Sequence, residues 1–331
     1  MLDSKTPTEK GGINLADKIR EFKVQNDPGN QEIREKRLIE RSRIEGTRVF
    51  REILADRLQW NQCSHAFQDT VIQGVEQQLG AAFAWVETQS YSCQQATHRI
   101  ATFCHIETNI ELNLIPGGQY VRGTRDMEAE LDFVKRFYPT RDIDFFGLGK
   151  PRSVTVAPML MGCFPVTYAQ WSKVQRRRKD QEWKGANFPI ENIAWERTQD
   201  WLRQVGDGLR LPWEREWEYA CRAGTGTRFF WGQNMDAAYC WDHGNSSRQT
   251  HEVTEHKDNP NAFGLVDMSG NVSEWCQNDY HDWETWYAKE YKIVRGGNVS
   301  QDAAFCRCAH VGLARLRSDH AHVGFRVAVT I

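Results

Sequence analysis

The sequence predicts an α+β protein in which a helical and mixed N-terminal segment precedes a large domain with little regular secondary structure. Apolar residues recur with a period near 3.6 before residue 80, and the period changes to two from about residue 99. Twelve of the 13 tryptophans lie between Trp85 and Trp286. Because tryptophan fills core space and its N–H needs a partner, this density predicts a core closed by irregular loops.

The N-terminal third divides into two parts. Residues 1–30 are rich in Lys, Asp, Asn, Gly and Pro, so we expect a mobile arm. Residues 31–98 form the helical and mixed segment, in which two amphipathic helices are expected to pack on the rest of the protein. Their apolar positions are Val49, Phe50, Ile53, Leu54 and Leu58 for the first helix, and Val71, Val75 and Leu79 for the second.

Residues 99–331 form the large domain. Apolar and polar residues alternate over 100–106 and 110–114, and the alternation ends at the turn residues Pro116, Gly117 and Gly118. Two helices are predicted farther along, one over 195–205 that ends near Gly206 and one over 213–221. The remaining residues are expected to form short strands and loops.

Composition excludes several classes of protein. The 331 residues carry a formal net charge of −2, which provides no overall attraction to nucleic acid or to an anionic membrane. The polar start lacks an apolar leader, and no run of about twenty apolar residues occurs. We therefore expect a cytoplasmic protein. The nine cysteines are odd in number and scattered, which predicts buried thiols rather than a disulfide framework.

Four motif segments occur in a fixed order in the large domain. They are 115–124 (IPGGQYVRGT), 211–225 (LPWEREWEYACRAGT) followed by 230–232 (FWG), 259–275 (NPNAFGLVDMSGNVSEW), and 294–297 (VRGG) closed by 324–327 (GFRV). Together they resemble the formylglycine-generating-enzyme family, also called sulfatase-modifying factors. The resemblance covers about residues 110–331 and implies an elaborated C-type-lectin-like fold.

The same resemblance implies a calcium site in the third motif. Asn271 and Glu274 would be side-chain ligands there, with nearby carbonyls completing the shell, and hard oxygen ligands suit Ca²⁺. The alternative is a loop held by hydrogen bonds from these side chains to the backbone. No cofactor is required for the function proposed from the sequence.

The catalytic cysteine pair of the resembled enzymes is incomplete in this chain. Those enzymes use copper and two cysteines in a stretch of the form Arg-Gly-Gly-Ser-x-x-Cys-x-x-x-x-Cys. Arg295 to Gly297 match its start, the first cysteine position holds Gln301, and the second holds Cys306. Because an amide does not replace a thiolate as a Cu(I) ligand, we predict a protein that is not an enzyme. The alternative function is a copper- or thiol-dependent oxidase that uses Cys306.

Residues 298–323 resemble the variable region of proteins diversified by retroelements, which use the same domain as a scaffold. In those proteins, randomised adenines turn AAC codons into NNC, which cannot encode Lys, Glu, Gln, Met or Trp. Gln301 is the only member of that set in this stretch, where average usage would give roughly five. The stretch shows neither helical nor strand periodicity, as a tolerant binding surface would.

The resemblance therefore predicts a non-catalytic variable protein that binds a ligand, most simply another protein. A scaffold that folds with many fillings cannot rely on those side chains for its core, so we expect them to be exposed and contiguous. The candidate ligand-binding residues are Val299, Ser300, Asp302, Ala303, Phe305, His310, Gly312, Leu313, Leu316, Ser318, His320 and His322. The expected frame consists of Arg295, Gly296, Gly297, Cys306, Gly324, Phe325 and Arg326. An ordinary irregular surface loop is the alternative.

Overall fold

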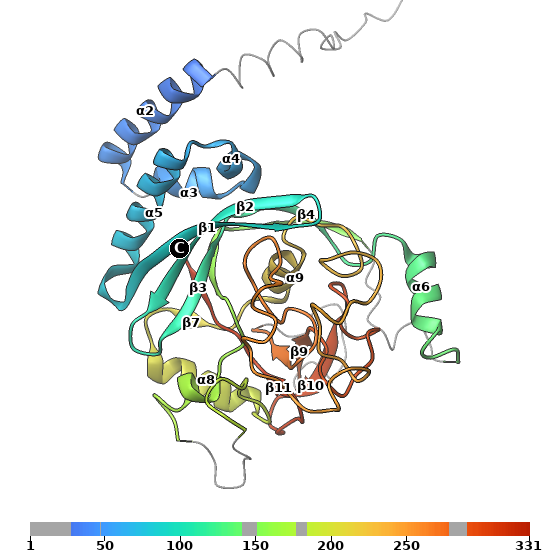
Figure 1. Cartoon of the computed structure of the whole chain (residues 1–331). Helices are drawn as coiled ribbons and strands as arrows, with labels where there is room; N and C mark the ends of the chain where they lie inside the picture. The colour runs from blue at the N-terminus through green and yellow to red at the C-terminus, as the bar shows by residue number, and fades with distance from the viewer. Residues whose placement is uncertain (1–27, 47, 141–150, 177–183, 278–289) are drawn as a thin grey trace, which may run out of the picture.

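The computed structural model describes residues 28–46, 48–140, 151–176, 184–277 and 290–331. It shows an α+β protein in which N-terminal helices lie beside a twisted antiparallel sheet, and the loop-rich remainder of the domain lies on the other side of that sheet (Figure 1). The expected arm at 1–30 falls outside the described residues except at its end, where Pro28 already begins a helix.

The N-terminal segment contains α2 (Pro28–Glu45), α3 (Arg48–Leu54), α4 (Arg57–Gln62) and α5 (His65–Leu79), followed by the short 3-10 helix η1 (Gly80–Ala82). The single helix expected around residues 49–58 is broken, because Asp56 caps α4 by accepting a hydrogen bond from the Leu58 N–H. This cap changes the phase of the helical face. Leu58, predicted on the apolar face, is consequently 58% exposed.

The larger sheet has six strands in the order β1-β2-β3-β6-β12-β7. They are β1 (Phe83–Cys93), β2 (Ala96–His105), β3 (Ile110–Ile115), β6 (Met159–Gly162), β12 (Ala328–Thr330) and β7 (Leu209–Arg210). The expected domain boundary at residue 99 falls inside β2. Since β1 pairs antiparallel with β2, the sheet extends into the segment that precedes this boundary.

Two smaller sheets complete the strands. The first runs β10 (Gly312–Arg315), β9 (Tyr291–Arg295), β8 (Ser273–Trp275) and β11 (Val323–Gly324), and the second pairs β4 (Gly118–Arg122) with β5 (Arg152–Val156). The helices of this part are α6 (Met127–Lys135), α7 (Tyr168–Trp171), α8 (Trp195–Val205) and α9 (Glu214–Arg222). The helices predicted over 195–205 and 213–221 are thus confirmed, and Gly206 ends α8 with a φ of 74°.

Tryptophan rings close the core where regular structure is sparse. Trp171 and Trp201 stack with centroids 5.8 Å apart, and Phe325 meets both rings edge-on. The indole N–H of Trp201 donates to the Trp171 carbonyl at 3.1 Å, and the indole N–H of Trp275 donates to the Ile193 carbonyl at 2.9 Å. Large rings with backbone partners therefore replace strands in filling the core, as the tryptophan density predicts.

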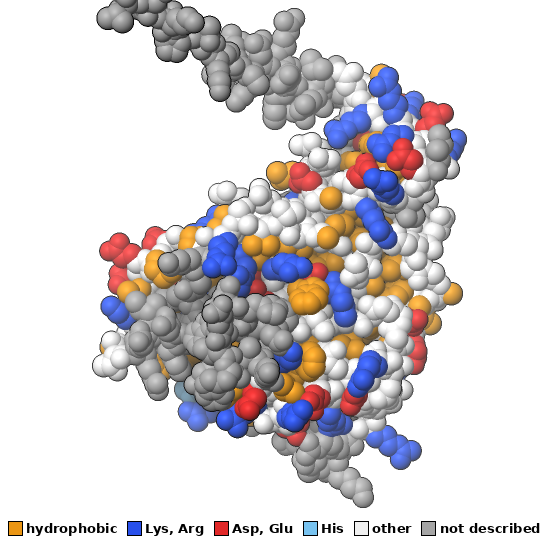
Figure 2. Space-filling view, turned by 180° about the vertical axis from the view of Figure 1, so that it is seen from behind, with side chains coloured by type: hydrophobic (Ala, Val, Ile, Leu, Met, Phe, Trp, Pro, Cys, Tyr) orange, Lys and Arg blue, Asp and Glu red, His pale blue; other side chains and the backbone are white. Residues whose placement is uncertain are grey.

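The surface carries mixed charge. On the face that Figure 2 shows, Lys and Arg side chains are interspersed with apolar and acidic side chains. Among the described helices, none combines the length and the apolar character needed to cross a bilayer.

Candidate functional site

The segment 298–323 is anchored at its start by the buried guanidinium of Arg295. Arg295 donates to Glu218 at 2.6 Å and to the Cys308 carbonyl at 2.8 Å, and it also donates to the His310 carbonyl. Burial alone would lower the pKa of Arg295, but the carboxylates of Glu214 and Glu218 raise it, so the charge is retained. The segment therefore wraps around a fixed cation.

Glycines in the frame allow close backbone contacts. Gly297 has a φ of 69°, and a Cβ there would lie 2.7 Å from the Cys306 sulfur and 2.9 Å from the Phe305 backbone. A Cβ on Gly324 would lie 2.3 Å from the Ile190 carbonyl oxygen. Phe325 is fully buried and packs edge-on against both stacked tryptophans. The frame roles predicted for these residues, backbone geometry and core packing, are confirmed.

The first half of the segment contradicts the expected exposure. Val299, Ala303, Phe305 and His310 are 0%, 2%, 9% and 4% exposed. His310 is held inward by the buried Arg295, which donates to the carbonyls of residues 308 and 310. Arg307 is also buried, and it pairs with Glu130 at 2.8 Å. Four of the twelve candidate positions therefore belong to the core.

The six candidate residues in the second half of the segment are at least partly exposed, whereas Ala314 between them is buried. We name this set the 312–322 surface, formed by Gly312, Leu313, Leu316, Ser318, His320 and His322. Leu313 is 39% exposed on β10, an edge strand of its sheet. His320 bonds the Arg315 carbonyl at 3.0 Å, and His322 bonds Glu191 at 2.8 Å. These two histidines are thus held in defined positions.

Ser300 and Asp302, the remaining candidate positions, have other neighbours. Ser300 is exposed, and Asp302 accepts a hydrogen bond from the Tyr138 hydroxyl and lies 3.9 Å from the His243 ring nitrogen. This grouping joins the segment to loops at 138 and 243, which the sequence did not associate with it.

The cysteines near the predicted catalytic position are buried thiols with separate partners. Residues 303–309 form turns rather than a strand, so Cys306 and Cys308 do not share one face of a strand. The Cys308 sulfur lies 3.4 Å from the Cys221 sulfur, whereas Cys306 contacts Cys240. Burial, followed by the hydrogen bond with Cys306, raises the pKa of Cys240 well above its usual value. Gln301 donates its backbone N–H to the Asn298 carbonyl at 2.9 Å.

The side chains predicted to bind calcium do not fit that role. Arg326 donates to both oxygens of Glu274 at 2.8 and 2.7 Å, and the Trp217 N–H donates to the same carboxylate at 2.7 Å. The side-chain oxygen of Asn271 accepts a hydrogen bond from the backbone N–H of His251 at 3.0 Å. The side-chain NH₂ of Asn271 donates to Asp267 at 2.8 Å. Within the described ranges, no group of three or more His, Cys, Asp or Glu side chains has a metal-binding arrangement. The expectation for Glu274 is therefore wrong, because an arginine already neutralises its carboxylate.

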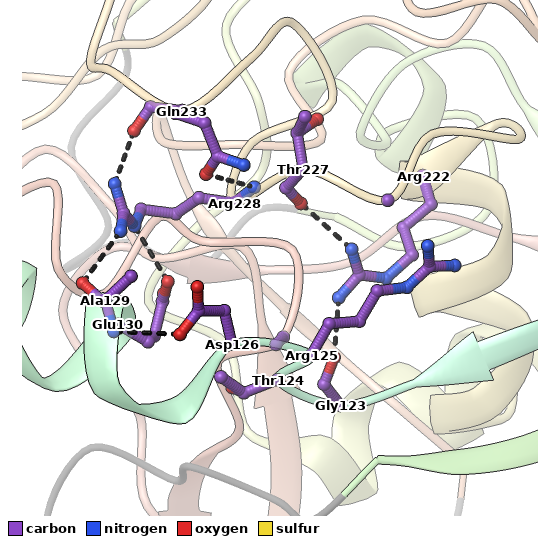
Figure 3. A pocket seen from close by; sticks show the side chains of 12 residues that line it. Gly123, Thr124, Arg125, Asp126, Ala129, Glu130, Arg222, Thr227, Arg228 and Gln233 are labelled. Carbon is purple, nitrogen blue, oxygen red and sulfur yellow. Dashed lines mark hydrogen bonds and ion pairs between the residues drawn. The ribbon is translucent and has the colours of Figure 1, made fainter.

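Sequence reasoning missed a group of arginines around the loop that follows α9. Figure 3 shows Arg125 extended alongside Arg222, with Arg228 on the opposite side held by Ala129, Glu130 and Gln233. A cavity of about 330 Å³ lies between them. These residues come from distant positions without periodicity, so no local pattern indicated that they meet.

Comparison of this chain with known proteins identifies a family match and similar solved structures. Residues 101–331 match the sulfatase-modifying factor enzyme 1-like domain. A stretch of 84 residues is 36% identical to the serine/threonine-protein kinase pkn1 of Chlamydia pneumoniae, which covers 22% of this chain and 14% of that protein. The chain thus matches only a small part of the length of this relative.

Two solved structures share the fold. PvdO from Pseudomonas aeruginosa aligns with a TM-score of 0.57 and 23% identity, over 70% of this chain and 98% of PvdO. Treponema denticola variable protein 1 aligns with a TM-score of 0.55 and 20% identity, over 74% of this chain and 99% of that protein. Both confirm the α+β, C-type-lectin-like architecture. Because the family match spans most of the chain, this protein belongs to the family of the sulfatase-modifying factor enzyme 1-like domain.

Proposed function

We propose that this chain is a non-catalytic variable protein whose 312–322 surface binds a protein ligand and is diversified by a retroelement. The observation that carries the proposal is the difference in burial between the flanking frame residues and the 312–322 surface. Arg295 and Phe325 are fully buried on either side of the segment, while the six residues of the 312–322 surface between them are at least partly exposed. Substitutions on such a surface leave the scaffold intact. The likeness to Treponema denticola variable protein 1 supports it.

The composition of the 312–322 surface suits a protein partner. Leu313 offers an exposed apolar group on β10, and the exposed residues Arg315 and Arg317 follow it along the chain. Arginine is enriched in protein interfaces, where an apolar centre is surrounded by polar groups. Since β10 lies at a sheet edge, its outer backbone groups are also placed for pairing with an extended segment.

The experiment that tests the proposal is sequencing of the DNA around the coding region. We expect a near-copy of the region encoding residues 298–323, which differs from it mainly where the copy has adenine. The differing codons should fall at the six residues of the 312–322 surface and at Ser300 and Asp302, and not at the buried Val299, Ala303, Phe305 and His310. A locus without such a copy would overturn the diversification, and changes concentrated at the buried four would overturn the assignment of the surface.

A further inference from the structure

Three hollows adjoin around residues 224–227, which follow α9. Their volumes are about 330, 500 and 180 Å³. Gly226 and Thr227 line both the first and the second, and Gly224 and Thr225 line both the second and the third. The loop therefore forms a common wall between neighbouring spaces.

The smallest hollow is rich in arginine and has no acidic lining residue. Arg57, Arg125 and Arg222 line it, together with Gln119, Tyr120, Val121, Ser153, Tyr219, Gly224 and Thr225. Three arginines thus border a space of about 180 Å³, and the guanidinium of Arg222 also donates to Glu218 and to the carbonyls of Thr227 and Gly123. Such a concentration of cations next to hydroxyl groups is typical of a site for an anion.

Glycines make room for two of these arginines. A Cβ on Gly118 would lie 3.0 Å from Arg57 Nη1, and one on Gly226 would lie 2.3 Å from Arg125 Nη1. Arg57 Nη1 also donates to the Gln119 carbonyl at 3.1 Å, and its guanidinium lies 6.0 Å from the centre of the Tyr219 ring. Arg57 is therefore placed by a backbone carbonyl and an aromatic ring, and Arg125 occupies the space that Gly226 leaves open.

The positive charge of this hollow is incompletely balanced. Arg222 forms an ion pair with Glu218 at 2.9 Å, but Glu218 also forms an ion pair with the buried Arg295 at 2.6 Å. Neither Arg57 nor Arg125 forms an ion pair with any residue that the structure describes. Burial, followed by the neighbouring charge of Arg222, lowers the pKa of Arg125. A bound anion would relieve this repulsion.

We propose that the hollow lined by Arg57, Arg125 and Arg222 binds the phosphoryl group of a small phosphate monoester. Planar guanidiniums present paired N–H donors that match phosphate oxygens, and a dianion would balance the two arginines without carboxylate partners. The adjoining 500 Å³ hollow, lined by neutral polar residues such as Asn61, Gln94 and Thr97, would hold the organic part of the ligand.

The site joins the two parts of the chain. Arg57 lies on α4, outside the residues 101–331 that match the family, whereas Arg125 and Arg222 lie inside them. Backbone hydrogen bonds fix this junction, because Arg57 N–H donates to the Gly117 carbonyl at 2.8 Å and Gly117 N–H donates to the Leu54 carbonyl at 2.7 Å. The N-terminal helices thus complete a pocket that the family domain alone leaves open. This inference does not depend on the 312–322 surface.

Isothermal titration calorimetry on the full chain tests the proposal. The ligands are inorganic phosphate, phenyl phosphate and acetate at constant ionic strength, and the variants are Arg57→Gln and Arg125→Gln. We expect phenyl phosphate to bind more tightly than phosphate, acetate to show no binding, and each variant to raise the Kd by about tenfold, the loss of one charge-assisted contact. Arg203→Gln is the matched control, because this exposed arginine pairs with Asp200 on α8, away from the hollow.

Three outcomes would overturn it. They are the absence of heat with both phosphates, equal affinity of both variants and the wild type, and binding of acetate as tight as that of phosphate. Circular dichroism and the melting temperature establish that the variants fold. Since Arg125 makes no described ion pair, Arg125→Gln provides a folded variant even if Arg57→Gln disturbs the junction with Gly117.

Discussion

The Arg326 guanidinium donates to both carboxylate oxygens of Glu274, and neither side chain is exposed to solvent. Arg326 also donates to the carbonyls of Gly162, Cys163 and Val266. Arg326, next to Phe325, is thus connected both to β8 through Glu274 and to the end of β6 through the Gly162 carbonyl. Breaking a buried pair leaves an uncompensated charge in the interior, so its cost is high even where its net contribution to folding is small.

Glu274→Gln should therefore lower the free energy of unfolding by about 3–5 kcal/mol. Urea denaturation followed by circular dichroism measures this change. Glu196→Gln is the control, because Glu196 and Arg317 form an exposed pair at 3.0 Å whose loss should cost less than about 1 kcal/mol. Equal effects of the two substitutions would contradict the structural role of the buried pair.

Removal of divalent cations should leave the melting temperature unchanged. A metal that binds only the folded state stabilises it by mass action, but Glu274 is neutralised by Arg326 and the Asn271 oxygen accepts the His251 N–H. Differential scanning fluorimetry with EDTA and with added CaCl₂ checks this prediction. A fall in melting temperature with EDTA that disappears in Glu274→Ala would restore the calcium site.

Frame and surface positions should differ sharply in their effect on stability. Phe325→Ala removes a buried ring that packs edge-on against Trp171 and Trp201 and should cost about 3–5 kcal/mol. Substituting Leu313, Leu316 and Ser318 with Asn should change stability by about 0.5 kcal/mol per position. Chemical denaturation compares the two. Loss of folding in the triple variant would contradict the assignment of these residues to a tolerant surface.

Acid should destabilise the protein through His98. Burial lowers the pKa of His98 from 6.5 to about 4, with a smaller contribution from Arg57. The unfolded chain therefore binds one more proton than the folded chain between these pH values. The unfolding free energy should fall as pH is lowered through this window, by up to about 1.4 kcal/mol per pH unit. His98→Gln should reduce the slope by about one proton, and an unchanged slope would contradict this account.

The chain should not convert cysteine to formylglycine. Gln301 stands where the first copper-binding cysteine is expected, and Cys306 is fully buried. An amide does not supply the thiolate that selects Cu(I). A sulfatase-motif peptide incubated with and without copper should show no product by mass spectrometry. Copper-dependent product that is lost in Cys306→Ser would instead establish an oxidase.

Local patterns predicted local structure well. Glycine-terminated apolar periodicity located α8 and α9, and the motif glycines at 297 and 324 lie where close packing requires them. Patterns failed where distant residues decide the outcome. The Asp56 cap broke a continuous apolar face, and Arg295 holds the His310 carbonyl in the core.

The arginine hollow shows the same limit more plainly. Arg57 lies on α4, Arg125 in the loop before α6 and Arg222 on α9, and each belongs locally to an ordinary mixed-charge stretch. Only the packing of α4 against the turn at Gly117 brings them together.

The position of β12 has a consequence for how the chain is made. This strand lies inside the larger sheet, between β6 and β7, although it is synthesised after the whole of 298–323. During translation, the edges of β6 and β7 that pair with β12 stay unpaired until residues 328–330 have been synthesised. A stop codon or frameshift within 298–323 therefore yields a chain that cannot close its sheet. If this segment is diversified, only variants whose reading frame continues to β12 can complete the sheet and fold.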